Sequence, residues 1–193
     1  SGGELFGGCV VLREALQLDN GDLATRLPEE VMPETDSPLS LSLTPTDGAT
    51  VSSPGSISVD ARGDICGAHA TGVPYNCVVT LDVIPEGNYE EFGMFLRSED
   101  KGINSYKLSF NSDNRTVRLH DSSISAVTGL DKPMKLTIVM KGDIIDVCVD
   151  NRRCIVNRLQ EKKGSQLWFF ARNGKLRFEN IKVCPITGDA SKR

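Results

Sequence analysis

The sequence predicts an all-β protein with two antiparallel layers packed face to face and minimal helix. Apolar and polar residues alternate through residues 134–183, which is the period-two pattern of half-buried strands. Turn-forming clusters interrupt this stretch at spacings that let each strand fold back on the last, at residues 141–143, 150–152, 163–165 and 173–174. No part of the sequence shows helical periodicity over three turns. A meander of this kind has one apolar face, so we expect a second layer to cover it.

The first part of the chain, residues 1–34, is expected to supply lead-in strands. The step Asn20-Gly21 lies between apolar residues and is a strong hairpin signal, so residues 16–18 should pair with residues 23–26. Residues 8–12 form a further strand candidate because they are short, apolar and rich in valine.

Residues 35–75 differ in composition from the rest of the chain. They are rich in Ser, Thr, Gly, Pro and Asp, which is also typical of a disordered linker. The alternation of apolar residues within 39–43 and 57–59 favours short edge strands joined by turns. We therefore expect this region to be an ordered insert.

Residues 76–185 are expected to hold the main strands. Segment 90–98 has apolar residues on both faces and is predicted to be central. About a dozen short strands are predicted in total, too many for one open sheet and suited to a two-layer sandwich of the jelly-roll or concanavalin A-like type. Residues 186–193 read as a tail. Because all-β sandwiches of this length commonly form one unit, residues 1–193 are expected to be a single domain.

Composition and charge argue against several classes of partner. The net charge is −4, with 22 basic and 26 acidic residues interspersed, which gives no footprint for nucleic acid. No apolar run approaches the roughly 20 residues of a membrane helix, so membrane insertion is not expected. The opening Ser1-Gly2-Gly3 reads as a cut end, and the chain is expected to be a fragment of a larger protein.

The six cysteines are scattered and include no C-x-x-C pair, so the sequence predicts neither a metal site nor a bound cofactor. Most are expected to be free thiols that act as small hydrophobes in strands. Cys148 and Cys154 are the exception, because a three-residue turn over 150–152 would place them opposite each other across a hairpin. A two-residue turn would put them out of register and exclude a bond.

Trp168 is the main candidate for ligand binding. In the segment 167–171 it shares one face with Phe170 and Arg172, and an aromatic strip beside an arginine suits the stacking of a sugar ring. We therefore name Trp168, Tyr106 and Arg172 as candidate carbohydrate-binding residues. The alternative is that the same aromatic residues are core.

No catalytic residue is predicted. Glycoside hydrolysis needs two carboxylates about 5 to 10 Å apart, but the acidic residues of this chain are spread throughout and none lies in a recognisable catalytic motif. A nucleophile elbow, a phosphate-binding loop and a dinucleotide fingerprint are also absent from the sequence.

Two motifs resemble the C-terminal β-sandwich module of glycoside hydrolase family 32. Residues 8–30 are similar to the family's lead-in, a Pro-Arg-Glu-Leu run followed by a turn and a strand that ends before Pro and Glu. Leu12 and Ala15 depart from that pattern, and the positions that fit it are Arg13, Glu14, Gly21, Leu23, Pro28 and Glu30. Residues 146–150 resemble the family's Glu-Val-Phe-Val-Asn strand with three of five positions altered, and the Leu-Trp-Phe-Phe-Ala segment follows in the same order.

This resemblance implies a noncatalytic accessory domain that packs on an upstream, fructan-cleaving five-bladed propeller of the same protein. The propeller motifs of that family, Asn-Asp-Pro, Arg-Asp-Pro and Glu-Cys, are absent from this sequence. The parent would then be a β-fructofuranosidase-type glycoside hydrolase, and an extracytoplasmic location is expected. Two alternatives are a carbohydrate-binding module that binds an oligosaccharide itself and a lectin-like cell-surface interaction domain.

Overall fold

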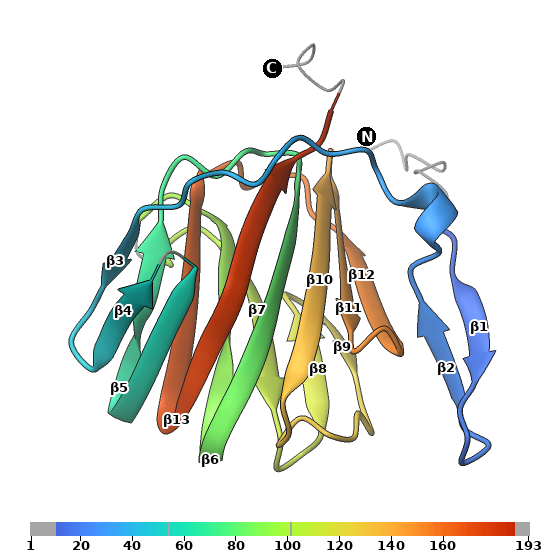
Figure 1. The fold of residues 1–193 in the computed structure, drawn as a ribbon, viewed down its shortest axis with the longest axis horizontal. Coiled ribbons are helices and arrows are strands. Elements are labelled where there is room, and N and C mark those ends of the chain that lie inside the picture. Colours follow the sequence, from blue (N-terminus) through green and yellow to red (C-terminus); the bar gives the residue numbers. More distant parts are fainter. Residues whose placement is uncertain (1–10, 54, 101, 188–193) are drawn as a thin grey trace, which may run out of the picture.

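The computed structural model describes residues 11–53, 55–100 and 102–187, and these residues form a β-sandwich (Figure 1). The strands within these ranges are β1 (Glu14–Gln17), β2 (Leu23–Arg26), β3 (Leu43–Pro45), β4 (Ala49–Ser53), β5 (Ser56–Ala70), β6 (Cys77–Ser98), β7 (Tyr106–Asn111), β8 (Thr116–Leu119), β9 (Ser122–Ile124), β10 (Met134–Lys141), β11 (Ile144–Val149), β12 (Arg153–Arg158) and β13 (Gln166–Pro185). The cut end at 1–3, most of the predicted strand 8–12 and most of the tail lie outside the described residues. Residues 11 and 12 are not in a strand.

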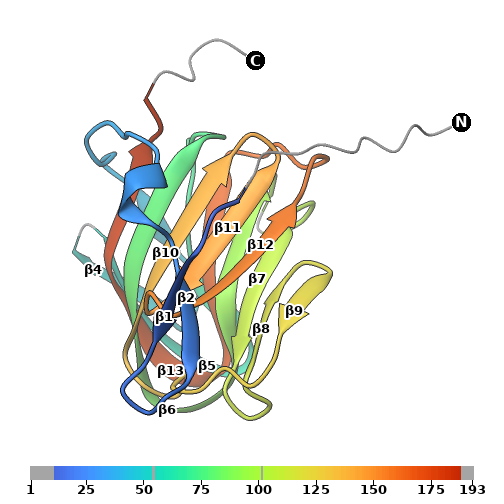
Figure 2. The same cartoon turned by 90° about the vertical axis from the view of Figure 1, so that its right-hand side faces the viewer.

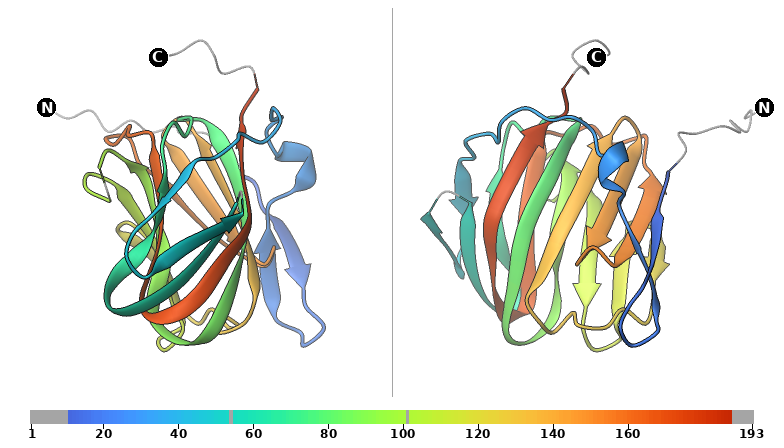
Figure 3. Two further views of the ribbon diagram at one scale, coloured as in Figure 1. Left: turned by 60° about the vertical axis from the view of Figure 1, so that its left-hand side comes forward. Right: turned by 45° about the vertical axis from the view of Figure 1, so that its right-hand side comes forward.

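Three long strands connect the two layers of the sandwich. Strands β5, β6 and β13 contain 15, 22 and 20 residues, far more than the short strands that the sequence predicts. Each contributes one half to each layer, and the register of β13 shifts around Gly174, where the strands pass from one layer to the other. These passages are why the strand pairing traces one continuous sheet although the strands are arranged in two layers (Figure 3).

Among the residues that the structure describes, each layer contains seven strand segments, and the halves of β5, β13 and β6 occupy the same positions in both. The first layer runs β4, the first half of β5, the second half of β13, the first half of β6, β10, β11 and β12. The second layer runs β3, the second half of β5, the first half of β13, the second half of β6, β7, β8 and β9. All of these pairings are antiparallel, as the turn spacing predicts.

The core lies between the layers and is built from the inward face of each strand. Phe169 from the second layer meets Phe178 from the first, with ring centroids 5.5 Å apart, and both side chains are fully buried. Phe92 stacks on Phe110 at 4.7 Å and meets Phe178 edge-on. The strict alternation in β10, where Met134, Leu136, Ile138 and Met140 are buried, is the period-two pattern of the sequence expressed as packing.

The β1–β2 hairpin covers part of the outer face of the first layer (Figure 2). Its register pairs Leu16 with Ala24, which confirms the hairpin that Asn20-Gly21 predicts, although β1 begins two residues earlier than expected. A single 3-10 turn, Glu29–Val31, follows it. The hairpin is separate from the main sheet and is joined to it by side chains and a few backbone bonds, including that from the Thr25 N–H to the Arg152 carbonyl.

Residues 35–75 contain both short and long strands. β3 and β4 are short and lie at the edges of their layers, whereas β5 is long and lies between β13 and these edge strands in both. The strand expected over 39–43 begins only at Leu43. Instead, the Asp36 and Leu39 N–H groups donate to carbonyls at the end of β13.

None of the described helical segments is long and apolar enough to cross a membrane.

Candidate functional site

Trp168 lies in an outer aromatic strip, which we define as His69, Trp168, Phe95 and Phe170. In β13, the side chains of Leu167, Phe169 and Ala171 belong to the core, so the intervening residues face outward. The register places Trp168 between His69 of β5 and Phe95 of β6. The strip therefore crosses three neighbouring strands on the outer face of the second layer.

The rings of the strip pack in two stacked pairs. Trp168 stacks on His69 with centroids 5.5 Å apart, and Phe95 stacks on Phe170 at 4.7 Å. Phe170 is fully buried, although it faces outward. It pairs with Gly67 and Gly93 on its two sides, and the absence of side chains there leaves room for the ring to lie close to the sheet.

Two nitrogen atoms of the strip have no hydrogen-bond partner. Trp168 Nε1 and His69 Nδ1 are both buried, and neither has a partner within the described part of the chain. Trp168 as a whole is 6% exposed. A buried indole N–H usually finds an acceptor, so these two atoms depart from the usual pairing of buried polar groups.

Charged residues border the strip on the Phe170 side. The Lys107 ammonium lies 5.3 Å from the Phe170 ring centroid and 2.7 Å from a Glu91 carboxylate oxygen. Arg172 faces outward as expected, and its guanidinium lies 3.8 Å from the Glu90 carboxylate.

Tyr106 does not join Trp168 and Arg172. It faces the core, is 2% exposed, and its hydroxyl accepts hydrogen bonds from the backbone N–H groups of Glu161 and Lys162, at 2.8 and 2.9 Å. In this position its hydroxyl fastens the loop before β13. Of the three candidate residues that the sequence names, Trp168 and Arg172 share the outer face of β13, and Tyr106 lies in the core.

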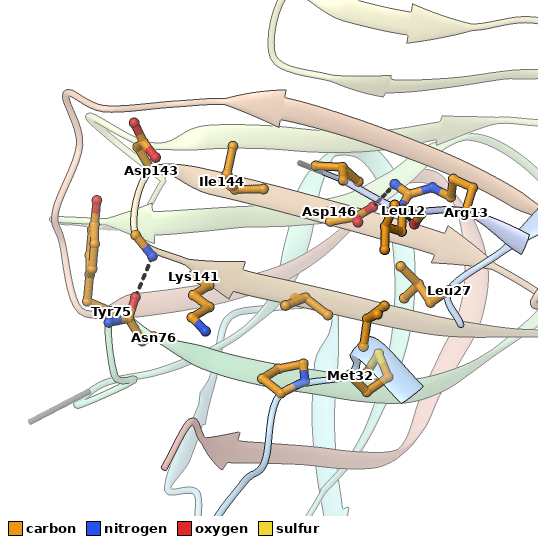
Figure 4. Close-up of a pocket in the computed structure, with 15 residues that line it drawn as sticks. Leu12, Arg13, Leu27, Met32, Tyr75, Asn76, Lys141, Asp143, Ile144 and Asp146 are labelled. Atoms are coloured by element: carbon orange, nitrogen blue, oxygen red, sulfur yellow. Dashed lines mark hydrogen bonds and ion pairs between the residues drawn. The ribbon is translucent and has the colours of Figure 1, made fainter. Parts of the chain in front are cut away.

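A second candidate site is a groove of about 510 Å³ between the hairpin and the outer face of the first layer (Figure 4). We call it the hairpin groove. Its apolar wall combines Leu12, Leu27, Val31, Met32 and Pro33 with Val139 of β10 and Ile144 of β11. Its volume falls within the usual range for small-ligand pockets.

One end of the hairpin groove is closed by a part-buried ion pair. Arg13 Nη2 lies 2.5 Å from Asp146 Oδ1, and the two side chains are 19% and 8% exposed. Burial raises the pKa of the Asp146 carboxyl, and the adjacent guanidinium of Arg13 offsets only part of that rise. The pair fixes the chain before β1 onto β11.

The opposite end of the groove is polar. Tyr75, Asn76, Lys141 and Asp143 lie there (Figure 4). The Asn76 side-chain oxygen accepts a hydrogen bond from the Gly142 N–H, and Asp143 is held by Arg158 at 2.5 Å. The Arg158 hydrogen bond is the main reason why the pKa of Asp143 is lowered.

Sequence reasoning missed the hairpin groove because its walls come from four separate parts of the chain. The one available signal was the set of apolar residues in the lead-in that fall outside the predicted strands, such as Leu27, Val31 and Met32. Within the described ranges, no group of three or more His, Cys, Asp or Glu side chains is arranged to hold a metal ion.

Comparisons with known proteins identify the fold. No protein-family model matches the sequence, and no curated protein matches it. Among solved structures, the carbohydrate-binding module CBM66 from Bacillus subtilis superposes with a TM-score of 0.63 at 12% identity, covering 74% of this chain and 94% of the module.

Two fungal enzymes match a larger share of this chain. The exo-inulinase from Aspergillus awamori has a TM-score of 0.60 at 11% identity over 92% of this chain, and the fructosyltransferase from A. japonicus has 0.58 at 13% over 94%. The chain spans about a third of the length of each, 35% and 32%. These matches confirm the predicted two-layer β-sandwich. Because the sequence identities are 11–13%, the matches show similarity of fold only.

Proposed function

We propose that this chain is a noncatalytic accessory domain of a family 32-type glycoside hydrolase, which packs on a fructan-cleaving propeller of the same protein. The observation that carries the proposal is the extent of the fungal matches. Each enzyme matches at least 92% of this chain while the chain accounts for about a third of the enzyme. The family 32 motifs in residues 8–30 and 146–150 support the same origin.

The outer surface beside the hairpin supports a packing partner. Four large hydrophobic residues are exposed on the hairpin, on its flanking segments or on β12 beneath it: Leu12, Leu23, Val31 and Val156. Leu23 is 71% exposed and Leu12 is 53% exposed. Apolar residues gathered on one side of a domain are typical of an interaction surface, and the hairpin groove lies among them. An extracytoplasmic location is part of this proposal and rests on the family resemblance.

The full coding region tests the proposal. We expect it to encode a five-bladed propeller with the family's Asn-Asp-Pro, Arg-Asp-Pro and Glu-Cys motifs. In that full-length protein, Leu12→Asp combined with Val31→Asp should lower the melting temperature of the catalytic domain. Ile103→Asp, at a residue that is 68% exposed in the connection between β6 and β7, should not. The isolated chain should hydrolyse neither sucrose, inulin nor levan. A coding region without a propeller, or turnover by the purified chain, would contradict the proposal.

A second candidate function is direct glycan binding at the outer aromatic strip. The observation that favours it is the pair of buried, unpartnered nitrogen atoms, Trp168 Nε1 and His69 Nδ1. A sugar hydroxyl would accept a hydrogen bond from the indole N–H, and another would pair with the imidazole nitrogen, while the apolar face of the sugar meets an aromatic ring. Because Trp168 is only 6% exposed, binding would require neighbouring side chains to move.

Calorimetry with fructo-oligosaccharides tests this second candidate. Trp168→Phe keeps an aromatic ring and removes the N–H, so it should weaken binding roughly tenfold, the scale of one lost hydrogen bond to a buried group. Tyr106→Phe is the control, because its hydroxyl is committed to the 161–162 backbone, and it should leave binding unchanged. Absence of binding by the wild-type chain, or equal binding by Trp168→Phe, would exclude the strip as a glycan site.

A further inference from the structure

The sulfur atoms of Cys148 and Cys154 lie 2.9 Å apart. The two residues are directly opposite each other in the β11–β12 pair, and their neighbours Val147–Ile155 and Val149–Arg153 continue the same register on both sides. Both cysteines face outward, because Val147 and Val149 beside them belong to the core. Within the described residues this is the one pair of cysteines whose sulfur atoms are in contact.

The turn between the strands sets this register. Asp150 and Asn151 have φ values of 49° and 53°, which are left-handed conformations that Asp and Asn tolerate better than most residues. Arg152 is the third turn residue, and its N–H donates to the Val149 carbonyl. The three-residue connection that the sequence requires for a bond is thus the one that forms, and the sulfur atoms face each other with no strand displacement.

The two thiols differ in access and in acidity. Cys148 is 2% exposed, whereas Cys154 is half-buried. The Cys154 thiol has two acceptors within reach, the Cys148 sulfur and the Thr25 carbonyl at 3.4 Å. Donation to the Cys148 sulfur lowers the pKa of Cys148 and raises that of Cys154. The more accessible sulfur therefore lies next to the one that ionises more readily.

We propose that Cys148 and Cys154 form an intrachain disulfide when the protein meets a disulfide oxidant such as oxidised glutathione. The reaction begins when one of the two cysteines, as its thiolate, attacks the S–S bond of oxidised glutathione, which forms a mixed disulfide and releases one glutathione. The thiolate of the other cysteine then attacks the protein sulfur of that mixed disulfide and expels the second glutathione. Both S–H bonds and the glutathione S–S bond are lost and one S–S bond forms, so the two electrons and two protons leave on two molecules of reduced glutathione.

The disulfide would hold β12, the strand against which the β1–β2 hairpin packs, to its neighbour β11. β12 is the edge strand of the first layer. The Arg153 guanidinium of β12 donates to the Leu23 carbonyl of β2, and the Thr25 N–H of β2 donates to the carbonyl of Arg152 in the turn before β12. A disulfide to β11 prevents this edge strand from separating. Because the closed loop is short, the gain in global stability is expected to be smaller than for disulfides that close long loops. The protection should therefore be local.

Mass spectrometry of the native chain in glutathione buffers tests the proposal. Wild-type protein should become two hydrogens lighter, and peptide mapping without reduction should recover residues 148 and 154 in one linked fragment. Cys148→Ala and Cys154→Ala should each abolish that product and stop at a mixed disulfide or a free thiol. Cys66→Ala, at a half-buried cysteine on β5, should leave it unchanged.

Hydrogen exchange gives a second measure that does not depend on the variants. The amides of β12 should exchange at least several-fold more slowly in the oxidised wild-type chain than in the reduced chain, while those of β8 should exchange equally. A native chain that stays fully reduced in excess oxidised glutathione, or one whose linked fragment joins other cysteines, would overturn the proposal.

Discussion

Arg13 and Asp146 are paired although 133 positions separate them in the chain. Arg13 precedes the hairpin and Asp146 lies on the outer face of β11, so this contact fixes the lead-in onto the sandwich and closes one end of the hairpin groove. The carboxylate is 8% exposed, and burial outweighs its partner in setting its pKa above the ordinary value of 3.8. The lead-in is therefore attached through a buried carboxylate that would destabilise the folded state if it lost its arginine partner.

Arg13→Met should lower the free energy of unfolding by about 2 kcal/mol at pH 7, because the buried Asp146 carboxylate would lose its partner. Chemical denaturation measures this change. Arg26→Met, in β2 of the adjoining hairpin, is the matched control. Its partner Glu14 is 40% exposed, and such surface pairs contribute about 0–1 kcal/mol. Equal losses for the two variants would show that Arg13 has no special role.

The loss in Arg13→Met should also depend on pH. Because the folded pKa of Asp146 is raised, the native state holds its proton more tightly than the unfolded chain. The contribution of Asp146 to stability is therefore greatest below pH 3.8 and falls as the pH rises through its folded pKa. Removing Arg13 raises that pKa further, so the gap between variant and wild type should shrink as the pH is lowered from 7 toward 4. A gap that widened on acidification would contradict this assignment.

Arg97→Met should cost about 3 kcal/mol of stability. Arg97 is 3% exposed, its guanidinium lies 3.7 Å from the centroid of the Tyr75 ring, and it donates to the carbonyls of Tyr75, Gly142 and Leu159. These three carbonyls belong to separate loops, and all would lose a charged donor. Thermal denaturation should separate this variant clearly from Arg172→Met, which changes an arginine whose side chain is 38% exposed and should stay within about 0.5 kcal/mol of wild type.

Gly174→Ala should destabilise the fold by about 2 to 3 kcal/mol through steric conflict. A methyl group at this position would lie 2.3 Å from Cβ and 2.7 Å from Cα of Tyr89, where β13 and β6 pass between the layers. Gly142→Asn is the control, because nothing lies within 4 Å of the added carbon and Asn tolerates its φ of 56°. Urea unfolding measures both. A neutral Gly174→Ala would show that the strands separate easily at this corner.

Cys77 should resist alkylation in the native chain. It is fully buried, and burial raises the pKa of its thiol to about 12, so almost none is ionised at pH 8. Iodoacetamide should label the half-buried Cys184 faster, and Cys77 only after unfolding. Peptide mapping after timed labelling measures the two rates. Rapid labelling of Cys77 in the native state would reveal opening of the first layer.

The regular parts of the fold could be predicted because their signals are local. The alternation in 134–140 fixes which side chains of β10 are buried, and Asn20-Gly21 specifies the first hairpin. For Cys148 and Cys154 the sequence left two turn lengths open, and the structure has the three-residue turn that places them opposite each other. Strand length was predicted less well. The sequence predicts a short strand over 90–98, yet this segment is the second part of the long bent strand β6, whose two halves pair with different strands in the two layers.

The candidate sites likewise combine features that local sequence patterns predict with features that only long-range contacts decide. The sequence placed Trp168 and Arg172 on one face of a strand, but only the register across β5, β13 and β6 decided that His69 and Phe95 lie on either side of the indole. Tyr106 was also a candidate aromatic residue on a predicted strand, but its side chain lies on the face of β7 that packs into the core.

The sequence by itself determined the fold class, the antiparallel order of the closing strands and the direction in which most side chains point, because alternation and turn chemistry act over a few residues. The tertiary structure decided what the long-range contacts create: the bending of β5, β6 and β13 through both layers, the hairpin groove held by Arg13 and Asp146, and the unpaired nitrogens of the outer aromatic strip. These features depend on contacts between residues far apart in the chain, which no local pattern encodes.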